Sequence, residues 1–337
     1  MPVTVALVGA DQSGKTTLFH ALTRGRGHEG VGMVDVPDRR LWALSDAVHP
    51  KKTTPAQVRL EDAPPGSRAQ RIAAAREADV LVTVARCFGP GADPLGEVQS
   101  LQVDFVLTDL ATVEKRLEVV GKELRVGRKE RAEEAETLEQ ARAHLDAGRP
   151  LRTLDLEPAQ HDHLAAIFAV SQKPWVLVAN VGDDQLPDGG PEVGRLREMA
   201  AEQQAPVVVV CAQLEAELAE LEPHEAAEMR ESYGVAEGGL DAVAAAVWAA
   251  GGLITYFTAG EPEARAWPCA KNSPAPVAAG VIHSDFERHF IRAEVTSVED
   301  LVAAGSMEAL RAAGKLRIEG RDYQVQDGDV VFFRIGR

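Results

Sequence analysis

A short glycine-containing segment near the start of the chain limits the possible folds more than any other feature. Residues 9–16 read GADQSGKT, which fits the phosphate-loop pattern G-x-x-x-x-G-K-[ST] at every defined position. The apolar run Val3–Val8 precedes this segment, and Lys15–Thr23 follows it with helical spacing of Leu18 and Leu22. Strand, glycine loop and helix come in the order of a P-loop unit, so the sequence predicts an α/β fold that binds phosphate here.

The residue types in this loop suit a phosphate chain. Glycine allows the curvature that turns backbone N–H groups toward an anion. Lys15 is expected to reach the β- and γ-phosphates, and the Thr16 hydroxyl is expected to coordinate Mg²⁺. The alternative is an accidental match, which the flanking strand and helix disfavour. The nucleotide-binding residues expected in this part of the chain are Gly9, Asp11, Gln12, Ser13, Gly14, Lys15, Thr16 and Thr17.

Three later segments are candidates for the same site. Asp62 ends a weaker strand at 58–60 and is a candidate Mg²⁺ ligand, directly or through water, unless it merely begins a turn. Residues 180–183 follow an apolar strand and have the N-x-x-D form of a base-recognition loop, although a simple turn is the alternative. Residues 211–213 follow another such strand and are placed against the base by position alone. The additional nucleotide-binding candidates are Asn180, Val181, Asp183, Cys211, Ala212 and Gln213.

The apolar pattern divides the chain into parts. Strand candidates separated by helical stretches predict a mostly parallel sheet covered on both faces. Residues 107–149 carry Leu and Val at three- and four-residue spacing with a break at Gly127, which predicts an antiparallel helical coiled-coil arm. Short strands and turns from residue 253 onward predict a small α+β domain. The expected organisation is a nucleotide-binding domain at 1–106 and 150–252, the arm at 107–149, and a C-terminal domain at 253–337.

Composition limits the partners. The formal net charge of −16 argues against nonspecific binding to DNA or to an anionic membrane. No apolar run approaches the roughly 20 residues that span a bilayer, and the N-terminus lacks the basic segment of a secretory signal. Three widely spaced cysteines favour a reducing compartment without disulfides or a zinc site. We therefore expect a cytoplasmic protein, and a monomer.

A basic cluster lies near the expected turn of the arm. Its members are Arg125, Arg128, Lys129 and Arg131. The cluster is either a contact surface, with RNA or the ribosome as the expected partner, or a solvated helical face.

Beyond these local patterns, the chain resembles the YchF (Obg-like) ATPases, a branch of the translation-factor-like P-loop proteins. The matching segments run in the same order along nearly the whole chain. They are Val36–Asp38, Pro50–Lys52, Asp109-Leu110, Val113–Leu117, Glu215–Leu218, Leu253–Gly260, Arg265–Trp267, Ala279–Arg288, Phe290–Val295, Gly314–Arg317 and Val325–Val330. The resemblance implies a G domain, a coiled-coil insertion and a C-terminal TGS domain of β-grasp fold. It also implies a preference for ATP over GTP, association with ribosomes, and a role in translation or stress regulation.

The chain departs from this family where hydrolysis is concerned. The family has a D-x-A-G motif before a long glycine-rich segment, whereas residues 62–67 read DAPPGS here, and Pro65 has no N–H for a γ-phosphate. Residues 24–33 are short and contain no threonine that could close over Mg²⁺. Asp183 replaces the usual Glu and resembles a guanine reader, while Val181 replaces the usual Lys, so ATP is favoured with GTP close behind.

Two functions therefore stay open. The first is a slow NTPase that acts as a ribosome-associated switch, with no residue standing out as a general base. The second is a nucleotide-binding adaptor, or an RNA-binding or ribosome-binding protein, with little or no hydrolysis.

Overall fold

The computed structural model describes residues 3–62, 68–235 and 238–336. The chain forms two compact units. The larger unit consists of Thr4–Gly32 and the described residues of Leu60–Val243. The smaller unit contains Met33–Arg59 and the described residues of Ala244–Arg337.

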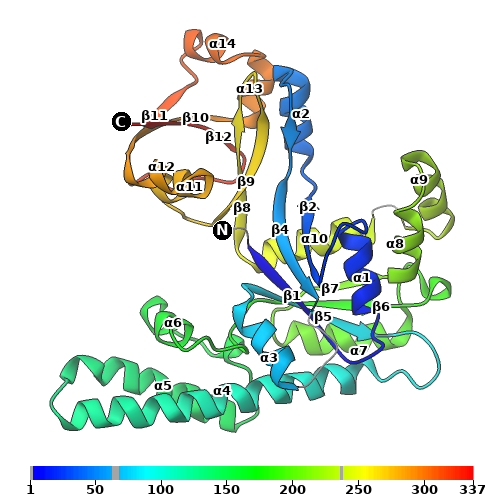
Figure 1. Ribbon diagram of the computed structural model, residues 1–337, viewed down its shortest axis with the longest axis vertical. Coiled ribbons are helices and arrows are strands. Elements are labelled where there is room, and N and C mark those ends of the chain that lie inside the picture. The colour runs from blue at the N-terminus through cyan, green and yellow to red at the C-terminus, as the bar shows by residue number, and fades with distance from the viewer. Residues whose placement is uncertain (1–2, 63–67, 236–237, 337) are drawn as a thin grey trace. The chain divides into compact units, whose positions relative to one another are not determined.

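The first sheet has the strand order β2-β4-β1-β5-β6-β7 (Figure 1). Its strands β1, β5, β6 and β7 are parallel and in continuous register. They read as runs of Val, Leu and Ala because both faces of the sheet are covered by helices. The chain reverses its direction of strand addition at β1, and the carboxyl edge there is where ligands of such sheets bind. The strands are β1 (Thr4–Val8), β2 (Val31–Val36), β4 (Ala56–Asp62), β5 (Val80–Arg86), β6 (Trp175–Asn180) and β7 (Val207–Val210).

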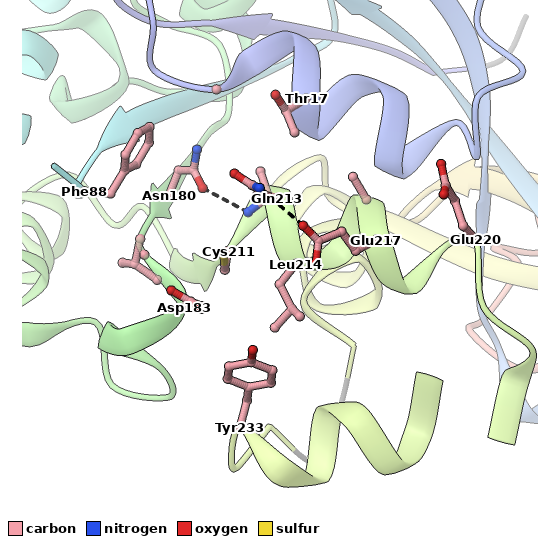
Figure 2. A pocket seen from close by; sticks show the side chains of 15 residues that line it. Thr17, Phe88, Asn180, Asp183, Cys211, Gln213, Leu214, Glu217, Glu220 and Tyr233 are labelled. Atoms are coloured by element: carbon pink, nitrogen blue, oxygen red, sulfur yellow. Dashed lines mark hydrogen bonds between the residues drawn. The ribbon is translucent and has the colours of Figure 1, made fainter. Parts of the chain in front are cut away.

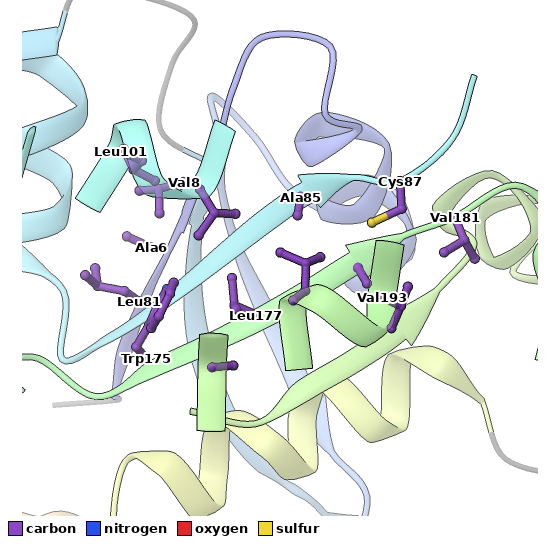
Figure 3. Packing of buried hydrophobic residues seen from close by; sticks show 14 of the residues in the cluster. Ala6, Val8, Leu81, Ala85, Cys87, Leu101, Trp175, Leu177, Val181 and Val193 are labelled. Carbon is purple, nitrogen blue, oxygen red and sulfur yellow. The ribbon is translucent and has the colours of Figure 1, made fainter. Parts of the chain in front are cut away.

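Helices of the larger unit cover its sheet. A core of buried side chains joins β1, β5 and β6 to helices α3, α4 and α7, and Figure 3 shows Leu81, Trp175 and Leu177 among them. The Trp175 indole N–H donates to Thr83 Oγ1 at 2.8 Å, so its one polar group is satisfied inside this core. The helices of this unit are α1 (Lys15–Leu22), α3 (Arg68–Glu77), α4 (Pro94–Arg125), α5 (Ala132–Asp146), α6 (Pro158–Ala165), α7 (Gly190–Ala201), α8 (Ala212–Leu218) and α9 (Pro223–Ser232), while α10 (Gly239–Ala250) has residues in both units.

Helices α4 and α5 form the helical arm, and Figure 1 shows them side by side. Their seam buries Val106, Val113 and Val120 of α4 against Leu138 and Leu145 of α5. Two short turns complete this region: η1 (Lys129–Arg131) joins the two helices and η2 (Leu151–Thr153) follows α5. Helix α4 begins at Pro94, well before residue 107, because Asp93 caps it by accepting from the Gly96 N–H at 3.0 Å. The first turns of α4 pack on the sheet, so a single helix serves both the sheet and the arm.

The smaller unit is built on the second sheet, whose strand order is β11-β10-β12-β8-β9-β3. A hairpin comes first, and the last strand returns to lie parallel beside the first strand of that hairpin. This order agrees with a β-grasp topology. Its core surrounds Tyr256, Phe290 and Val331. The elements are β3 (Thr53–Thr54), β8 (Leu253–Ala259), β9 (Ala264–Ala270), β10 (Phe290–Ser297), β11 (Arg317–Glu319), β12 (Asp329–Ile335), α2 (Arg39–Val48), α11 (Ala275–Ile282), α12 (Ser284–Arg288), α13 (Val298–Ala304) and α14 (Met307–Ala312).

Residues far apart in sequence are joined within the smaller unit. Strand β3 pairs in parallel with β9. Arg40 at the start of α2 binds Asp38 at 2.7 Å and Asp327 at 2.6 Å, and its guanidinium lies 5.3 Å from the centre of the Phe257 ring. Residues 33–59 thus pack with the C-terminal strands, which the expected boundaries at 106, 149 and 252 did not include. Those boundaries stay predictions.

Candidate nucleotide-binding site

The loop between β1 and α1 has a backbone that its two terminal glycines make possible. Gly9 has a φ of +152°, and a Cβ at this residue would lie 2.5 Å from the carbonyl oxygen of Val84. Gly14 has a φ of +90°, and a Cβ there would lie 2.1 Å from Nδ2 of Asn180. Any side chain at either position would collide with buried neighbours. The pattern glycines are therefore required by the close approach of the loop to β5 and to the residue that ends β6.

Lys15 folds back over this loop. Its Nζ donates to the carbonyl oxygens of Gly9 at 3.0 Å and Ala10 at 2.7 Å. Burial lowers the pKa of Lys15, and the nearby carboxylates of Asp62 and Asp11 act in the opposite direction. The ammonium group thus lies over the concave side of the loop, where the β- and γ-phosphates of a nucleotide would need a cation.

Thr16 and Asp62 meet at the beginning of α1. The Thr16 hydroxyl donates to Asp62 Oδ2 at 2.9 Å, while Asp62 Oδ1 is buried with no hydrogen-bond partner in the described chain. The Thr16 hydroxyl and the Asp62 carboxylate lie side by side, and one carboxylate oxygen has no hydrogen-bond partner among the described residues. These oxygens fit the oxygen preference of Mg²⁺. No group of three or more His, Cys, Asp or Glu residues that could hold a metal occurs among the described residues. A Mg²⁺ ion here would therefore need phosphate and water as its other ligands, as it usually has.

Asn180 joins the phosphate loop to the end of β7. Its Nδ2 donates to the Ser13 carbonyl at 2.9 Å, and its Oδ1 accepts from the Ala212 N–H at 3.0 Å. Asn180 is only 4% exposed, so both bonds are buried. The loop, β6 and the start of α8 are thereby fixed relative to one another. Ser13 is also fully buried, and its Oγ has no partner among the described residues.

A cavity of about 520 Å³ opens beside Asn180, and Figure 2 shows the side chains around it. The expected base-site residues meet here. Asp183 is exposed at its wall and accepts from the Asp184 N–H at 3.0 Å. Burial raises the pKa of the Cys211 thiol, so Cys211 lines the cavity as a neutral thiol and not as a reactive thiolate. The lining residues are Gly14, Thr17, Phe88, Asn180, Val181, Gly182, Asp183, Cys211, Ala212, Gln213, Leu214, Ala216, Glu217, Glu220 and Tyr233.

Sequence reasoning missed the aromatic walls of this cavity. Phe88 follows β5, and its position just beyond a strand end was a usable signal. Tyr233 follows α9, far along the chain, and no local pattern marks it. Both side chains offer flat apolar surface to a planar ring such as a nucleotide base.

Of the two loops expected to sense a γ-phosphate, the structure describes the one before β2. Residues 28–31 form a tight turn in which His28 and Val31 exchange backbone hydrogen bonds of 2.8 and 3.0 Å. Gly30 in that turn accepts from the Asp62 N–H at 2.8 Å. Thr23 is fully buried and donates to the Phe19 carbonyl, so it does not face Mg²⁺. Pro65 lies outside the described residues.

The basic residues of the arm lie at its turn, away from this site. Arg128 pairs with Glu123 at 3.0 Å, and Arg131 pairs with Glu123 and Glu134. Arg125 and Lys129 are exposed, and neither has an ion pair within the described residues. Carboxylates thus offset part of the cluster, and two cations remain available to a partner. No helix in the described ranges is long and apolar enough to span a membrane.

The sheet is parallel around its first strand, and a glycine loop follows that strand. A lysine lies over the loop and a Thr–Asp pair lies beside it. These features define a P-loop nucleotide-binding protein. Comparison with known proteins places the chain within this class. The family model YchF-GTPase_C, described as a protein of unknown function (DUF933), matches residues 253–336.

The similarity extends over the full chain. Ribosome-binding ATPase YchF of Bacillus subtilis is 38% identical over 99% of both chains. Ribosome-binding ATPase YchF of Haemophilus influenzae is 35% identical over 97% of this chain and 98% of its own length. The solved Schizosaccharomyces pombe YchF GTPase has the same fold, with a TM-score of 0.89 and 24% identity over 98% of this chain and 97% of its own. The chain belongs to the YchF family.

Proposed function

We propose that this chain binds a nucleoside triphosphate with Mg²⁺, hydrolyses it slowly and works in the cytoplasm in association with the ribosome. One observation carries the nucleotide part: Lys15, the Thr16–Asp62 pair and Asn180 converge on one loop beside a cavity with two aromatic walls. The bacterial relatives are named ribosome-binding ATPases, which supports the ribosomal part.

ATP is the proposed ligand, with GTP as the alternative. Asp183 is exposed at the cavity wall, where its carboxylate can accept from N–H groups of a guanine edge. The Phe88 and Tyr233 rings, in contrast, can stack on any base. Affinities for ATP, ADP, GTP and GDP, measured in parallel by titration calorimetry, test the choice. An Asp183→Ala variant should lose GTP affinity selectively if guanine is the native base, and should leave ATP affinity unchanged otherwise.

Catalysis in this site would rest on position and charge. Lys15 would hold the β- and γ-phosphates, and Thr16 with Asp62 would hold Mg²⁺, which supplies positive charge near the phosphates when bound. The Asn180 bonds keep the loop in the shape that the phosphates require. The tight turn at 28–31 brings no hydroxyl to the metal, so turnover should be slow.

A single-turnover assay with labelled ATP and GTP tests hydrolysis. The expected result is a low rate that disappears in a Lys15→Ala variant. Measurable binding with hydrolysis no faster than in Lys15→Ala would favour the alternative, an adaptor that binds nucleotide without turnover.

Ribosome association is tested by co-sedimentation with ribosomes. We propose that the arm turn contributes, and that residues 253–336 form a TGS-type domain in a monomeric protein. Replacing Arg125, Arg128 and Lys129 by Glu should weaken binding, and salt should weaken it in the wild type. Arg142→Glu, on α5 of the same arm, is the matched control. Undiminished binding of the triple variant would remove the arm turn from the interface.

A further inference from the structure

A second cavity, of about 450 Å³, borders the other end of the phosphate loop. It opens beside the start of the loop, whereas the cavity with aromatic walls opens beside its end. Helices α3 and α4 supply the remaining walls. The lining residues are Gly9, Ala10, Asp11, Arg71, Asp93, Gly96, Glu97, Ser100, Leu101 and Asp104.

The two cavities fix the direction of a bound nucleotide. A base held beside Asn180 and Gly14 leaves the phosphate chain to run along the loop, toward Lys15 and the loop start. The terminal phosphate is the group farthest from the base. It would therefore lie nearest Gly9–Asp11, where the second cavity begins.

Arg71 on α3 is the cation in the wall of this second cavity. It is half-buried, and its positive charge is close enough to Lys15 to act on that ammonium group. Arg71 already interacts with a neighbouring group. A guanidinium has five N–H donors, so a phosphate and this neighbouring group can bind Arg71 at the same time.

The carboxylates of this wall are mostly engaged elsewhere. Asp93 caps α4, Glu97 pairs with Arg86 at 3.2 Å, and Asp104 pairs with Arg68 at 2.9 Å. Their negative charge is thus partly offset by helix N–H groups and other arginines. Arg71 faces the loop start together with the exposed carboxylate of Asp11.

We infer that Arg71 contacts the terminal phosphate of the bound triphosphate and so makes this chain distinguish triphosphate from diphosphate. This inference rests on the proposed nucleotide binding. Physically, an arginine on the same chain would supply charge at the γ-phosphate, which the tight turn at 28–31 does not provide.

The test measures binding to the full chain of ADP and of a non-hydrolysable ATP analogue, both with Mg²⁺. Arg71→Ala should lower the affinity for the analogue by roughly ten- to hundredfold, the range for a lost charge-assisted hydrogen bond, and change ADP affinity less than about twofold. Arg71→Lys keeps the charge and should recover part of the loss. Arg195→Ala is the control, because it removes the same charge from the larger unit and lines neither cavity.

Each other outcome overturns the inference. An unchanged ratio of analogue to ADP affinity in Arg71→Ala would show that Arg71 does not reach the terminal phosphate. An equal loss for both nucleotides would assign Arg71 a structural role, which urea unfolding of the same variant would reveal. A wild-type chain that binds neither nucleotide would overturn the proposed function and this inference with it.

Discussion

Replacing Asn180 by Ala should destabilise the larger unit and weaken nucleotide binding together. Asn180 is a base-site residue by sequence pattern, yet its two polar atoms are both used within the protein. Nδ2 donates to the Ser13 carbonyl and Oδ1 accepts from the Ala212 N–H. The substitution removes both bonds and leaves two backbone groups without partners.

The magnitude follows from these two bonds. A buried group left unsatisfied costs about 1–3 kcal/mol. Water from the adjacent 520 Å³ cavity can reach the Ser13 carbonyl and the Ala212 N–H once the Asn180 side chain is removed. This places the cost near the lower limit for each of these two groups. We expect a loss of about 2–3 kcal/mol in the free energy of unfolding. The loop that Asn180 holds should also lose its shape, so triphosphate and diphosphate affinities should fall together.

Urea unfolding followed by circular dichroism measures the first effect, and titration calorimetry measures the second. Asp183→Ala is the matched control, because Asp183 lines the same cavity but is exposed, and its carboxylate accepts only from the next residue's N–H in the described structure. The control should keep full stability. Reduced nucleotide affinity in Asn180→Ala with an unchanged free energy of unfolding would refute the reasoning. Asn180 would then contact the ligand directly and not hold the loop through its hydrogen bonds.

Three further predictions concern stability. Asp109 is 1% exposed and accepts two backbone N–H groups of the loop before β6, so Asp109→Ala should cost about 2–4 kcal/mol in urea unfolding, and Asp109→Asn should cost less. Hydrogen bonding to Arg334 holds the pKa of Glu294 at about 2, below its value in the unfolded chain. Its contribution of about 1 kcal/mol is therefore present above pH 4.5 and lost as the pH falls toward 2, so the stability difference from Glu294→Gln should shrink over that window. Arg40→Ala removes the ion pairs with Asp38 and Asp327 and the contact with the Phe257 ring, and should lower the stability of the smaller unit by about 1 kcal/mol, whereas Arg39→Ala should not; equal effects would contradict a specific role for Arg40.

The sequence predicted the local structure around the glycine loop. The loop pattern, the strand before it and the helix after it are all consequences of near neighbours in the chain. The roles expected for Lys15 and Thr16 rest on the same local pattern and stay predictions. The paired helices of the arm were also predicted, since their apolar spacing is a local property, but the start of α4 was not. Helix α4 begins at Pro94, with Asp93 as its cap, and its first turns pack on the sheet and not on α5. The apolar spacing of the arm therefore does not mark where the helix starts.

Contacts between distant segments decided the rest. The meeting of Thr16 with Asp62, of Ser13 with Asn180, and of the loop start with Arg71 each depends on how parallel strands and their helices stack. The pattern of residues 180–183 indicated a base reader, but only the fold shows that the first residue of that pattern is a structural tie and the last is free to face a ligand.

By itself, the sequence determined a phosphate loop, because the backbone of such a loop is set by its own glycines and the helix that follows. Only the tertiary structure decided what surrounds that loop. It placed two aromatic walls at one end, Phe88 after β5 and Tyr233 after α9, and Arg71 of α3 at the other. These segments are separate in sequence and meet only when the sheet buries its apolar faces.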